Sequence, residues 1–522
     1  MKLPFKNMGH MLQIQADTYQ NKTVIRFYDR DISYSELEEM TGRVASRLLE
    51  MNVKKGDRVC LMMDNSPEFI FTYFGIIRAG AIAGPINCWW QDREIRYLLN
   101  DSAAVALVFD ATYRDRIDRL GPDASALKHI IERNGTDDRY ISYDSLLEKK
   151  GSEPLDQSKL DDVSTIVYTS GTTGNPKGVL LTHRNILTNS WQAGKLASIS
   201  ENDVVLCFLP LFHVNGLVIT GTAPIFAGAQ IILRKNFSAT EFWECVSSYG
   251  VTIFSGVPTI YQILLATPFE KKLDISSLRY GVCGAAPMPV DTIRKFEEQF
   301  NMIIVEGYGL TEGTAGATAN PIDGVRKIGS IGIPFAESEI KLFDENDNEM
   351  PQGEVGEIVI RGGNVMKGYF NKPEETAKAL RGGWLHTGDM AYQDPDGYFF
   401  IVDRKKEMII RGGENIYPKE VEEIIFSHPA VQEVAVIGVP DEMYGEEVMA
   451  CLVPLPGSAI EPAEFRTWCR DNMASYKVPR YVEVRQALPK NILGKILKKE
   501  LKAELAGEGK ITSPGSKREQ PA

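Results

Sequence analysis

Short apolar runs alternate with amphipathic segments through the first 400 residues of the chain. Ser33 and Glu36 have the spacing of a helix capping box. The apolar residues after them recur at helical spacing: Leu37, Met40, Val44 and Leu48. Residues 58–63 and 163–168 are short apolar runs that predict strands, and the Ser-Pro pair at 66–67 is typical of a helix start. This alternation predicts an α/β fold.

The two most apolar stretches, residues 69–85 and 217–233, are too interrupted to span a membrane. Arg78 breaks the first, and glycine and proline break the second, whereas a spanning helix needs about 18 or more clean apolar residues. Residues 1–17 also lack the continuous apolar run of a signal peptide. We therefore expect buried core segments and no transmembrane segment.

The composition is that of a soluble globular protein. Charged residues make up 25% and hydrophobic residues 43% of the 522 residues. The formal net charge of −12 argues against non-specific nucleic-acid binding, which needs a basic face. The seven cysteines contain no C-x-x-C pair and predict neither a disulfide framework nor a zinc site. A reducing compartment fits them, so we expect a cytoplasmic protein.

The pattern changes near residue 400. A turn-rich segment at 394–397 (DPDG) precedes a predicted strand at 398–402 and a charged run at 403–407 (DRKKE). Beyond it, periodicity predicts a fresh set of elements: helices at 419–427 and 462–472, and strands at 433–439, 448–455 and 481–484. These are enough for a small α+β domain. The polar tail, residues 507–522, is rich in Gly and Pro and is expected to be disordered.

Residues 168–178 (YTSGTTGNPKG) form a loop rich in glycine and hydroxyl groups, directly after a predicted strand. Glycines let backbone N–H groups turn toward an anion, hydroxyls donate further hydrogen bonds, and Lys177 supplies positive charge, so the loop suits a polyphosphate. It is not a Walker A loop, because Lys177 precedes Gly178 and Val179 follows it. The next helix is expected near Thr182. On composition alone, a flexible surface turn explains the loop equally well.

Residues 168–178 resemble the signature of the adenylate-forming superfamily, which includes acyl-CoA synthetases, luciferases and the adenylation domains of peptide synthetases. Further segments resemble this family's motifs in the family's order: 209–213 (LPLFH), 281–287 (GVCGAAP), 306–312 (EGYGLTE), 384–389 (WLHTGD), 403–407 (DRKKE), 411–418 (RGGENIYP) and 488–495 (LPKNILGK). The resemblance implies a large α/β domain of mixed and parallel sheets flanked by helices, residues 1–403. A hinge at 404–406 and a small mobile α+β domain at 407–506 would follow.

The resemblance assigns most of these motifs to the nucleotide. It places the following residues at ATP or AMP: Thr169, Ser170, Gly171, Thr172, Thr173, Gly174, Lys177, Gly284, Ala285, Ala286, Glu306, Gly307, Tyr308, Gly309, Thr311, Asp389 and Arg404. Tyr308 would stack on adenine, Thr311 would contact the α-phosphate, and Asp389 would accept from both ribose hydroxyls. Glu312 would act in catalysis as the carboxylate nearest Mg²⁺, where one carboxylate can suffice. Without the resemblance, these segments are tight turns.

The resemblance also implies which residues act on the acid and on coenzyme A. Lys495 stands in the P-K-x-x-x-G-K arrangement of the family's catalytic lysine and is assigned to adenylation. His213 matches a histidine beside the acyl carboxylate and would position substrate, although a lone histidine is more often packed or solvent-facing. Lys406 matches the hinge position. Gly412 and Gly413 match the loop that lines the pantetheine tunnel.

The implied reaction activates a carboxylic acid with ATP as acyl-AMP, releases pyrophosphate, and transfers the acyl group to coenzyme A. The run 383–417 resembles fatty-acyl-CoA synthetases most, so we expect a medium- or long-chain fatty acid, with an aromatic or alicyclic acid as the alternative. An enzyme that loads a separate carrier protein would share every ATP motif, and a homodimer is compatible with the sequence. A luciferase-like oxygenase and a non-catalytic nucleotide sensor use the same fold. Four motif residues disfavour the sensor: Lys177, Glu312, Asp389 and Lys495.

Overall fold

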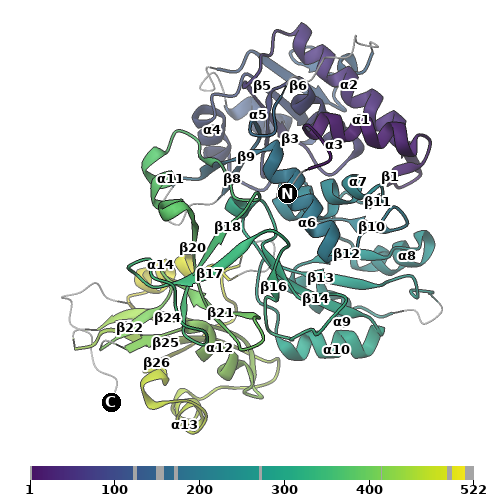
Figure 1. The fold of residues 1–522 in the computed structure, drawn as a ribbon. Helices are drawn as coiled ribbons and strands as arrows, with labels where there is room; N and C mark the ends of the chain where they lie inside the picture. Colours follow the sequence, from purple (N-terminus) through teal and green to yellow (C-terminus); the bar gives the residue numbers. More distant parts are fainter. Residues whose placement is uncertain are drawn as a thin grey trace. The chain divides into compact units, whose positions relative to one another are not determined.

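The computed structural model describes residues 3–120, 126–148, 158–169, 175–269, 273–412, 414–441, 443–490 and 496–511. The chain packs into two compact units, whose elements are labelled in Figure 1. The first unit contains Met1–Ile340 and Val359–His386, and the second contains Lys341–Ile358 and Thr387–Ala522. This division reflects packing and does not locate a hinge, so the hinge at residues 404–406 stays a prediction.

A nine-stranded sheet in the first unit has the order β16-β15-β14-β13-β12-β10-β11-β1-β2. Its strands are β1 (Thr23–Phe27), β2 (Arg30–Ser33), β10 (Val204–Cys207), β11 (Gln230–Leu233), β12 (Ile253–Gly256), β13 (Tyr280–Cys283), β14 (Ile303–Tyr308), β15 (Thr318–Ala319) and β16 (Ile333–Pro334). From β14 to β1 the neighbours are parallel, so their carboxyl ends meet at one edge. The chain leaves β10 for β11 on one side and then adds β12 on the other. Ligands bind at such a reversal of strand order in open α/β sheets.

Helices and a π-helix connect the strands of this sheet. They are α6 (His183–Leu196), η4 (Asn215–Thr222), α7 (Ala223–Ala227), α8 (Ala239–Tyr249), α9 (Pro258–Ala266) and α10 (Val290–Phe300). Buried rings of Trp243, Phe254 and Phe296 belong to one core cluster that α8, α9 and α10 share with the sheet. Most of the apolar stretch 217–233 is buried in η4, α7 and β11, which confirms its prediction as a core segment.

An eight-stranded sheet of the same unit has the order β19-β9-β8-β4-β3-β5-β6-β7. Its strands are β3 (Arg58–Met62), β4 (Ile82–Pro85), β5 (Ala106–Asp110), β6 (His129–Arg133), β7 (Ile141–Ser142), β8 (Val163–Thr169), β9 (Lys177–Thr182) and β19 (Gly368–Tyr369). Its helices are α1 (Met8–Tyr19), α2 (Tyr34–Glu50), α3 (Pro67–Arg78), α4 (Asp92–Asp101), α5 (Arg114–Leu120) and α11 (Pro373–Ala379). Helices α1, α2 and α3 pack on one another (Figure 1). The hydroxyls of Ser33 and Ser66 cap α2 and α3 as predicted.

Two smaller sheets hold the rest of the chain. A four-stranded sheet contains β17 (Glu339–Phe343), β18 (Gly356–Arg361), β20 (Leu385–Gln393) and β21 (Phe399–Arg404). A five-stranded sheet contains β22 (Ile409–Arg411), β23 (Glu414–Ile416), β24 (Val431–Asp441), β25 (Gly445–Pro454) and β26 (Tyr481–Val484). Helices α12 (Pro418–Phe426), α13 (Pro462–Asn472) and α14 (Lys498–Gly507) accompany it. The predicted helix at 462–472 and strand at 481–484 are confirmed to the residue.

The described chain continues past the start of the predicted tail. Helix α14 extends through Gly507, and Lys510 forms an ion pair with Glu483. The predicted disorder is therefore wrong for residues 507–511, and residues 512–522 lie outside the described part. Among the described helices, none has the length and apolar character needed to cross a membrane.

Candidate active site

The carboxyl edge of the nine-stranded sheet gathers predicted site residues from three motifs. His213 follows β10, Gly284 follows β13, and Gly309 follows β14. The edge includes the strand reversal between β10 and β12, where η4 begins at Asn215 and the Ser255 hydroxyl donates to the Asn215 Oδ1 at 3.1 Å. The fold thus places motifs that are far apart in sequence at one edge of one sheet.

The loop after β14 has room only for glycine at position 309. A Cβ on Gly309 would lie 1.6 Å from the carbonyl oxygen of Ala315. The Tyr308 carbonyl accepts the N–H of Ala317 at 2.8 Å, and the Glu306 carboxylate accepts the N–H of Gly329 at 2.8 Å. These bonds hold the end of β14 in a tight turn, so its small residues are required by the close approach of two backbone segments.

The loop after β13 contacts the end of β14. The N–H of Gly284 donates to the Gly256 carbonyl at 3.3 Å, and a Cβ on Gly284 would lie 3.5 Å from the Gly307 carbonyl oxygen. Ala285 has φ of +67°, a left-handed conformation that is uncommon outside glycine. Gly284 therefore lies close to Gly307, and the small residues at these two positions allow a flat ligand to approach the backbone.

The loop that carries His213 is fixed by a residue from the eight-stranded sheet. Asn65 follows β3 and is buried; its Nδ2 donates to the carbonyl of Leu209 at 2.9 Å, and its Oδ1 accepts the N–H of Leu211 at 2.9 Å. Burial lowers the pKa of His213 to about 4, so its imidazole is neutral near pH 7. A neutral imidazole can orient a carboxylate by hydrogen bonding, which fits a positioning role.

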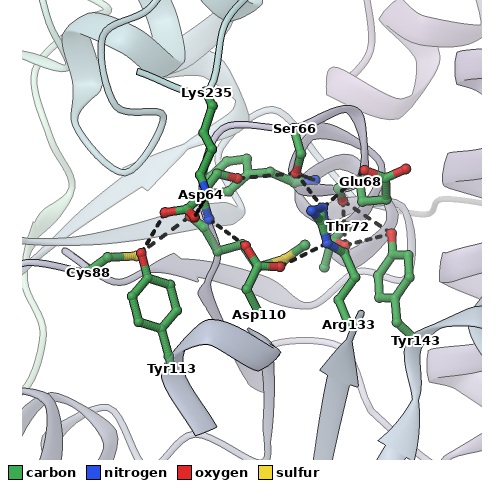
Figure 2. A network of polar contacts seen from close by, with 12 residues as sticks. Asp64, Ser66, Glu68, Thr72, Cys88, Asp110, Tyr113, Arg133, Tyr143 and Lys235 are labelled. Atoms are coloured by element: carbon green, nitrogen blue, oxygen red, sulfur yellow. Dashed lines mark hydrogen bonds and ion pairs between the residues drawn. The ribbon is translucent and has the colours of Figure 1, made fainter. Parts of the chain in front are cut away.

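A partly buried polar network surrounds Asp64, which precedes Asn65, at the carboxyl ends of β3, β5 and β6 (Figure 2). Asp64 accepts from the Tyr113 hydroxyl at 2.5 Å and from Lys235 Nζ at 3.0 Å, and its N–H donates to Asp110 at 2.8 Å. Arg133 Nε lies 2.8 Å from Asp110 Oδ1. Because cations and anions pair with one another, this network supports the chain around Asn65 as a structural element.

Cys88 belongs to the same network and carries no reactive thiolate. Burial raises the pKa of its thiol to about 12, so it stays protonated near pH 7. Its Sγ lies 3.6 Å from the carbonyl of Met63. We therefore assign no nucleophile to this cluster.

The phosphate loop lies between two paired strands. Thr169 ends β8, Lys177 begins β9, and the two residues are register partners. The loop residues Ser170, Gly171, Thr172, Thr173 and Gly174 lie outside the described residues. The helix expected near Thr182 begins at His183, with Thr182 as its N-cap. Lys177 is therefore a strand residue with a fixed backbone position at the mouth of the loop.

Glu312 has one carboxylate oxygen engaged and the other open. The hydroxyl of Tyr369 donates to Glu312 Oε1 at 2.8 Å, and Lys177 Nζ lies 4.8 Å from the centre of the Tyr369 ring. Burial, and secondarily Glu312, raises the pKa of Tyr369, which stays a phenol. Among the described residues, none donates a hydrogen bond to Oε2, and no cluster of three or more His, Cys, Asp or Glu side chains could cage a metal. One carboxylate with a free oxygen fits Mg²⁺ held mainly by phosphate oxygens and water.

Asp389 and Arg404 form a pair in the second unit. They are register partners on β20 and β21, and Arg404 Nε lies 3.0 Å from Asp389 Oδ1. Asp389 is 5% exposed and lies inside a strand. Cross-strand pairing with β21 therefore places Asp389 in a strand, although Thr-Gly-Asp on its own favours a turn.

The residues predicted for the hinge, coenzyme A and the catalytic lysine also belong to the second unit, whereas Ala286 and Thr311 belong to the first. Burial, then Arg404, lowers the pKa of Lys406. Gly412 joins β22 to β23 with φ of +59°, and its N–H donates to the Tyr444 carbonyl at 2.8 Å. Gly413 and Lys495 lie outside the described residues.

The fold and the small-residue loops at the carboxyl edge define an adenylate-forming enzyme. Two family models match: "AMP-binding enzyme" over residues 12–370 and "AMP-binding enzyme C-terminal domain" over residues 420–495. The chain belongs to the family of AMP-binding enzymes, which confirms the resemblance and the predicted fold class. It is an acid–thiol ligase of the AMP-forming class.

Relatives named for different substrates match over nearly their whole length. The long-chain-fatty-acid–CoA ligase of Bacillus subtilis (strain 168) is 37% identical over 537 residues, covering 97% of this chain and 95% of the relative. A feruloyl-CoA synthase of an Amycolatopsis species is 38% identical over 482 residues, covering 92% and 95%. The crystal structure of ATP-bound MatB from Rhodopseudomonas palustris has a TM-score of 0.89 and 32% identity, covering 96% of this chain and 99% of that one.

Two residues at this site were missed by the sequence analysis. Asn65 follows the carboxyl end of a parallel strand, a position where polar residues often serve a site, so its placement after the strand at 58–63 was a usable signal. Tyr369 gave no such signal, because only the pairing of β19 with β9 brings it beside Lys177.

Proposed function

We propose that this chain joins a carboxylic acid to ATP, forming acyl-AMP and pyrophosphate, and then transfers the acyl group to the thiol of coenzyme A. The observation that carries the proposal is the gathering of Lys177, Glu312 and Tyr369 beside the end of the phosphate loop. The acid carboxylate and the α-phosphate are both anionic, so their approach needs cations and N–H dipoles that neutralise the developing charge. In this cluster Lys177 is a cation, and the Glu312 carboxylate is able to hold a second cation.

In the first half-reaction, Lys177 and the loop after Thr169 would hold the phosphates, Tyr308 would stack on adenine, and Thr311 would contact the α-phosphate. Glu312 would hold Mg²⁺, which would supply positive charge that offsets the charge of the phosphates.

The acid and the ribose would be held by other residues. His213 would orient the acid by a hydrogen bond from its neutral ring. Asp389 and Arg404 would bind the ribose, for which a paired carboxylate and guanidinium offer both acceptors and donors.

For the second half-reaction, we propose that residues 407–506 rotate about Lys406. Lys495, assigned to adenylation, would leave, and Gly412 and Gly413 would line the path of the coenzyme A thiol. The rotation would exchange the part of the small domain that carries Lys495 for the part that carries Gly412 and Gly413, and so keep water from the reactive anhydride. The rotation would have to break a bond across the hinge, in which the Asp403 carboxylate accepts the N–H of Lys419 at 2.8 Å.

The proposal also includes the identity of the acid substrate. A medium- or long-chain fatty acid is the first candidate, supported by the motif run 383–417 and by the fatty-acid ligase relative. An aromatic or alicyclic acid is the alternative, supported by the feruloyl-CoA synthase relative. Loading of a separate carrier protein is a third reading. The buried free cysteines support a cytoplasmic location, and sedimentation would test for a homodimer.

The test of the overall function is AMP release over a panel of fatty, aromatic and alicyclic acids, each with and without coenzyme A. We expect sustained turnover only with coenzyme A, and the acid with the highest kcat/KM identifies the substrate class. Turnover with an acyl carrier protein in place of coenzyme A would support the third reading. A protein that binds ATP but releases no AMP with any acid would be a nucleotide sensor instead.

The domain-rotation proposal is tested by measuring each half-reaction separately. Lys495→Ala should nearly abolish adenylation while leaving thioester formation from preformed acyl-AMP much less affected. Lys406→Pro, which fixes φ, should impair one half-reaction selectively. Lys502→Ala, at an exposed position on α14, is the matched control. Equal loss of both half-reactions in Lys495→Ala, or normal rates in Lys406→Pro, would overturn the assignment.

A further inference from the structure

We propose that Tyr369 is a positioning residue that keeps Lys177 and Glu312 apart as separate charged groups, each available to the metal–nucleotide complex. The inference rests on the proposed function and adds a residue that neither the motifs nor the family match assigns. It comes from a segment, residues 366–370, whose backbone bonds Glu312 and Gly178, the residue after Lys177, and whose Tyr369 side chain contacts both charged residues.

The backbone of residues 366–370 ties the two charged regions together. The N–H of Met366 donates to the Glu312 carbonyl at 2.8 Å, and the N–H of Phe370 donates to the Gly178 carbonyl at 2.8 Å. Between them, β19 pairs antiparallel with β9, so that Tyr369 lies opposite Val179. These backbone bonds alone therefore fix the position of Tyr369 relative to both Glu312 and the start of β9.

The turn around Gly368 sets the direction of the Tyr369 backbone. Gly368 has φ of +147°, and a Cβ there would lie 2.6 Å from Thr376 Cγ2. The N–H of Tyr369 donates to Thr376 Oγ1 at 2.9 Å. A side chain at 368 would push Thr376 away and remove this bond, so glycine at this position serves the placement of the tyrosine.

The Tyr369 side chain uses different parts for the two charges. Its hydroxyl donates to Glu312 Oε1 at 2.8 Å, and its ring face lies under Lys177 Nζ at 4.8 Å from the centroid. A cation is attracted to the face of an aromatic ring, whereas a carboxylate accepts a hydrogen bond from its hydroxyl. Among the described residues, Lys177 forms no ion pair with a carboxylate.

Separation of the two charges has a consequence for the nucleotide. A direct ion pair between Lys177 and Glu312 would occupy the ammonium that a phosphate needs and the carboxylate oxygen that a cation needs. With Tyr369 between them, the ammonium is held without being neutralised, and Glu312 keeps Oε2 open. The pair can then meet a phosphate and its Mg²⁺ at the same time.

Two substitutions separate the two contacts. Tyr369→Phe keeps the ring under Lys177 and removes the hydrogen bond to Glu312, and Tyr369→Leu removes both. The readouts are ATP affinity by calorimetry without and with Mg²⁺, and the Mg²⁺ concentration that gives half-maximal AMP release. Tyr140→Phe is the matched control, because the Tyr140 hydroxyl also donates to a carboxylate, that of Asp118, far from these motifs in sequence.

We expect Tyr369→Phe to raise the half-maximal Mg²⁺ concentration about threefold to tenfold, the range that loss of one hydrogen bond supports. Its ATP affinity without Mg²⁺ should stay within about twofold of the parent protein. Tyr369→Leu should weaken ATP binding in both conditions, because Lys177 becomes free to pair with Glu312.

Unchanged Mg²⁺ dependence in Tyr369→Phe would overturn the proposal, as would equal weakening of ATP binding with and without Mg²⁺. Thermal unfolding of each variant checks that the fold is kept. The calorimetric arms need no acid, so they test this inference even if no acid in the panel supports AMP release.

Discussion

Asn65 fixes the loop that carries His213, and we predict that its removal destabilises the first unit. Its side chain is 5% exposed and bonds three backbone groups: Nδ2 donates to the carbonyls of Leu209 at 2.9 Å and Arg234 at 3.2 Å, and Oδ1 accepts the N–H of Leu211 at 2.9 Å. Asn65→Ala leaves these buried groups without that partner. At about 1 kcal/mol for each bond, the expected loss is about 3 kcal/mol.

The assay is differential scanning calorimetry on the full chain. A loss of about 3 kcal/mol should lower the Tm of the first unit by on the order of 5 °C, since larger domains shift less for a given change in free energy. The KM for the acid should also rise, because the loop that orients His213 loses its support. Asn202→Ala, at an exposed position before β10, is the control and should leave both quantities unchanged.

The result that would refute this reasoning is a Tm shift for Asn65→Ala no larger than that for Asn202→Ala. Asn65→Asp refines the test, because it keeps the acceptor for the Leu211 N–H and removes both donated bonds. It also adds a buried charge beside Asp64, so it should be at least as destabilising as the alanine variant.

Two further predictions concern pH and packing. Burial lowers the pKa of His183 to about 4, and its Nδ1 accepts the N–H of Met8, so the folded state resists a proton that the unfolded state takes up near pH 6.5. The contribution of His183 to the free energy of unfolding should be fully present above about pH 6.5. It should be lost as the pH drops toward 4, which lowers the free energy of unfolding by about 3 kcal/mol. His183→Gln should flatten that decline in urea titrations at several pH values, and a parallel decline in both proteins would contradict the assignment. Gly309→Ala should abolish AMP binding, because its Cβ would meet the Ala315 oxygen at 1.6 Å. Gly194→Ala lies on α6 with open space around it, so its free energy of unfolding should rise by about 0.5 to 1 kcal/mol. Calorimetry that found the same AMP affinity and the same stability in the two variants would refute the packing argument.

Much of the local structure could be predicted because it depends on near neighbours. Ser33 and Ser66 cap the helices that their spacing predicted, and the strand at 481–484 is found as expected. The motifs also identified the family before any fold was known. Caps, turns and hydrophobic periods are short-range properties, so they are recorded in short stretches of residues.

Asp389 marks the limit of that information. Its Thr-Gly-Asp context favours a turn, yet it lies in β20 opposite Arg404. Strand pairing depends on which segments become neighbours in a sheet, and the hydrophobic period of one segment does not encode which strand lies beside it.

The sequence by itself determined many local elements of this protein and the family to which its motifs belong. Only the tertiary structure decided which side chains meet across that framework. Asn65 reaches the Leu211 N–H over 146 positions, and Tyr369 reaches Glu312 over 57. Both contacts follow from the order and register of strands and from the loops at their carboxyl ends. Those are set by packing of the whole first unit, so no local pattern at either residue could have specified its partner.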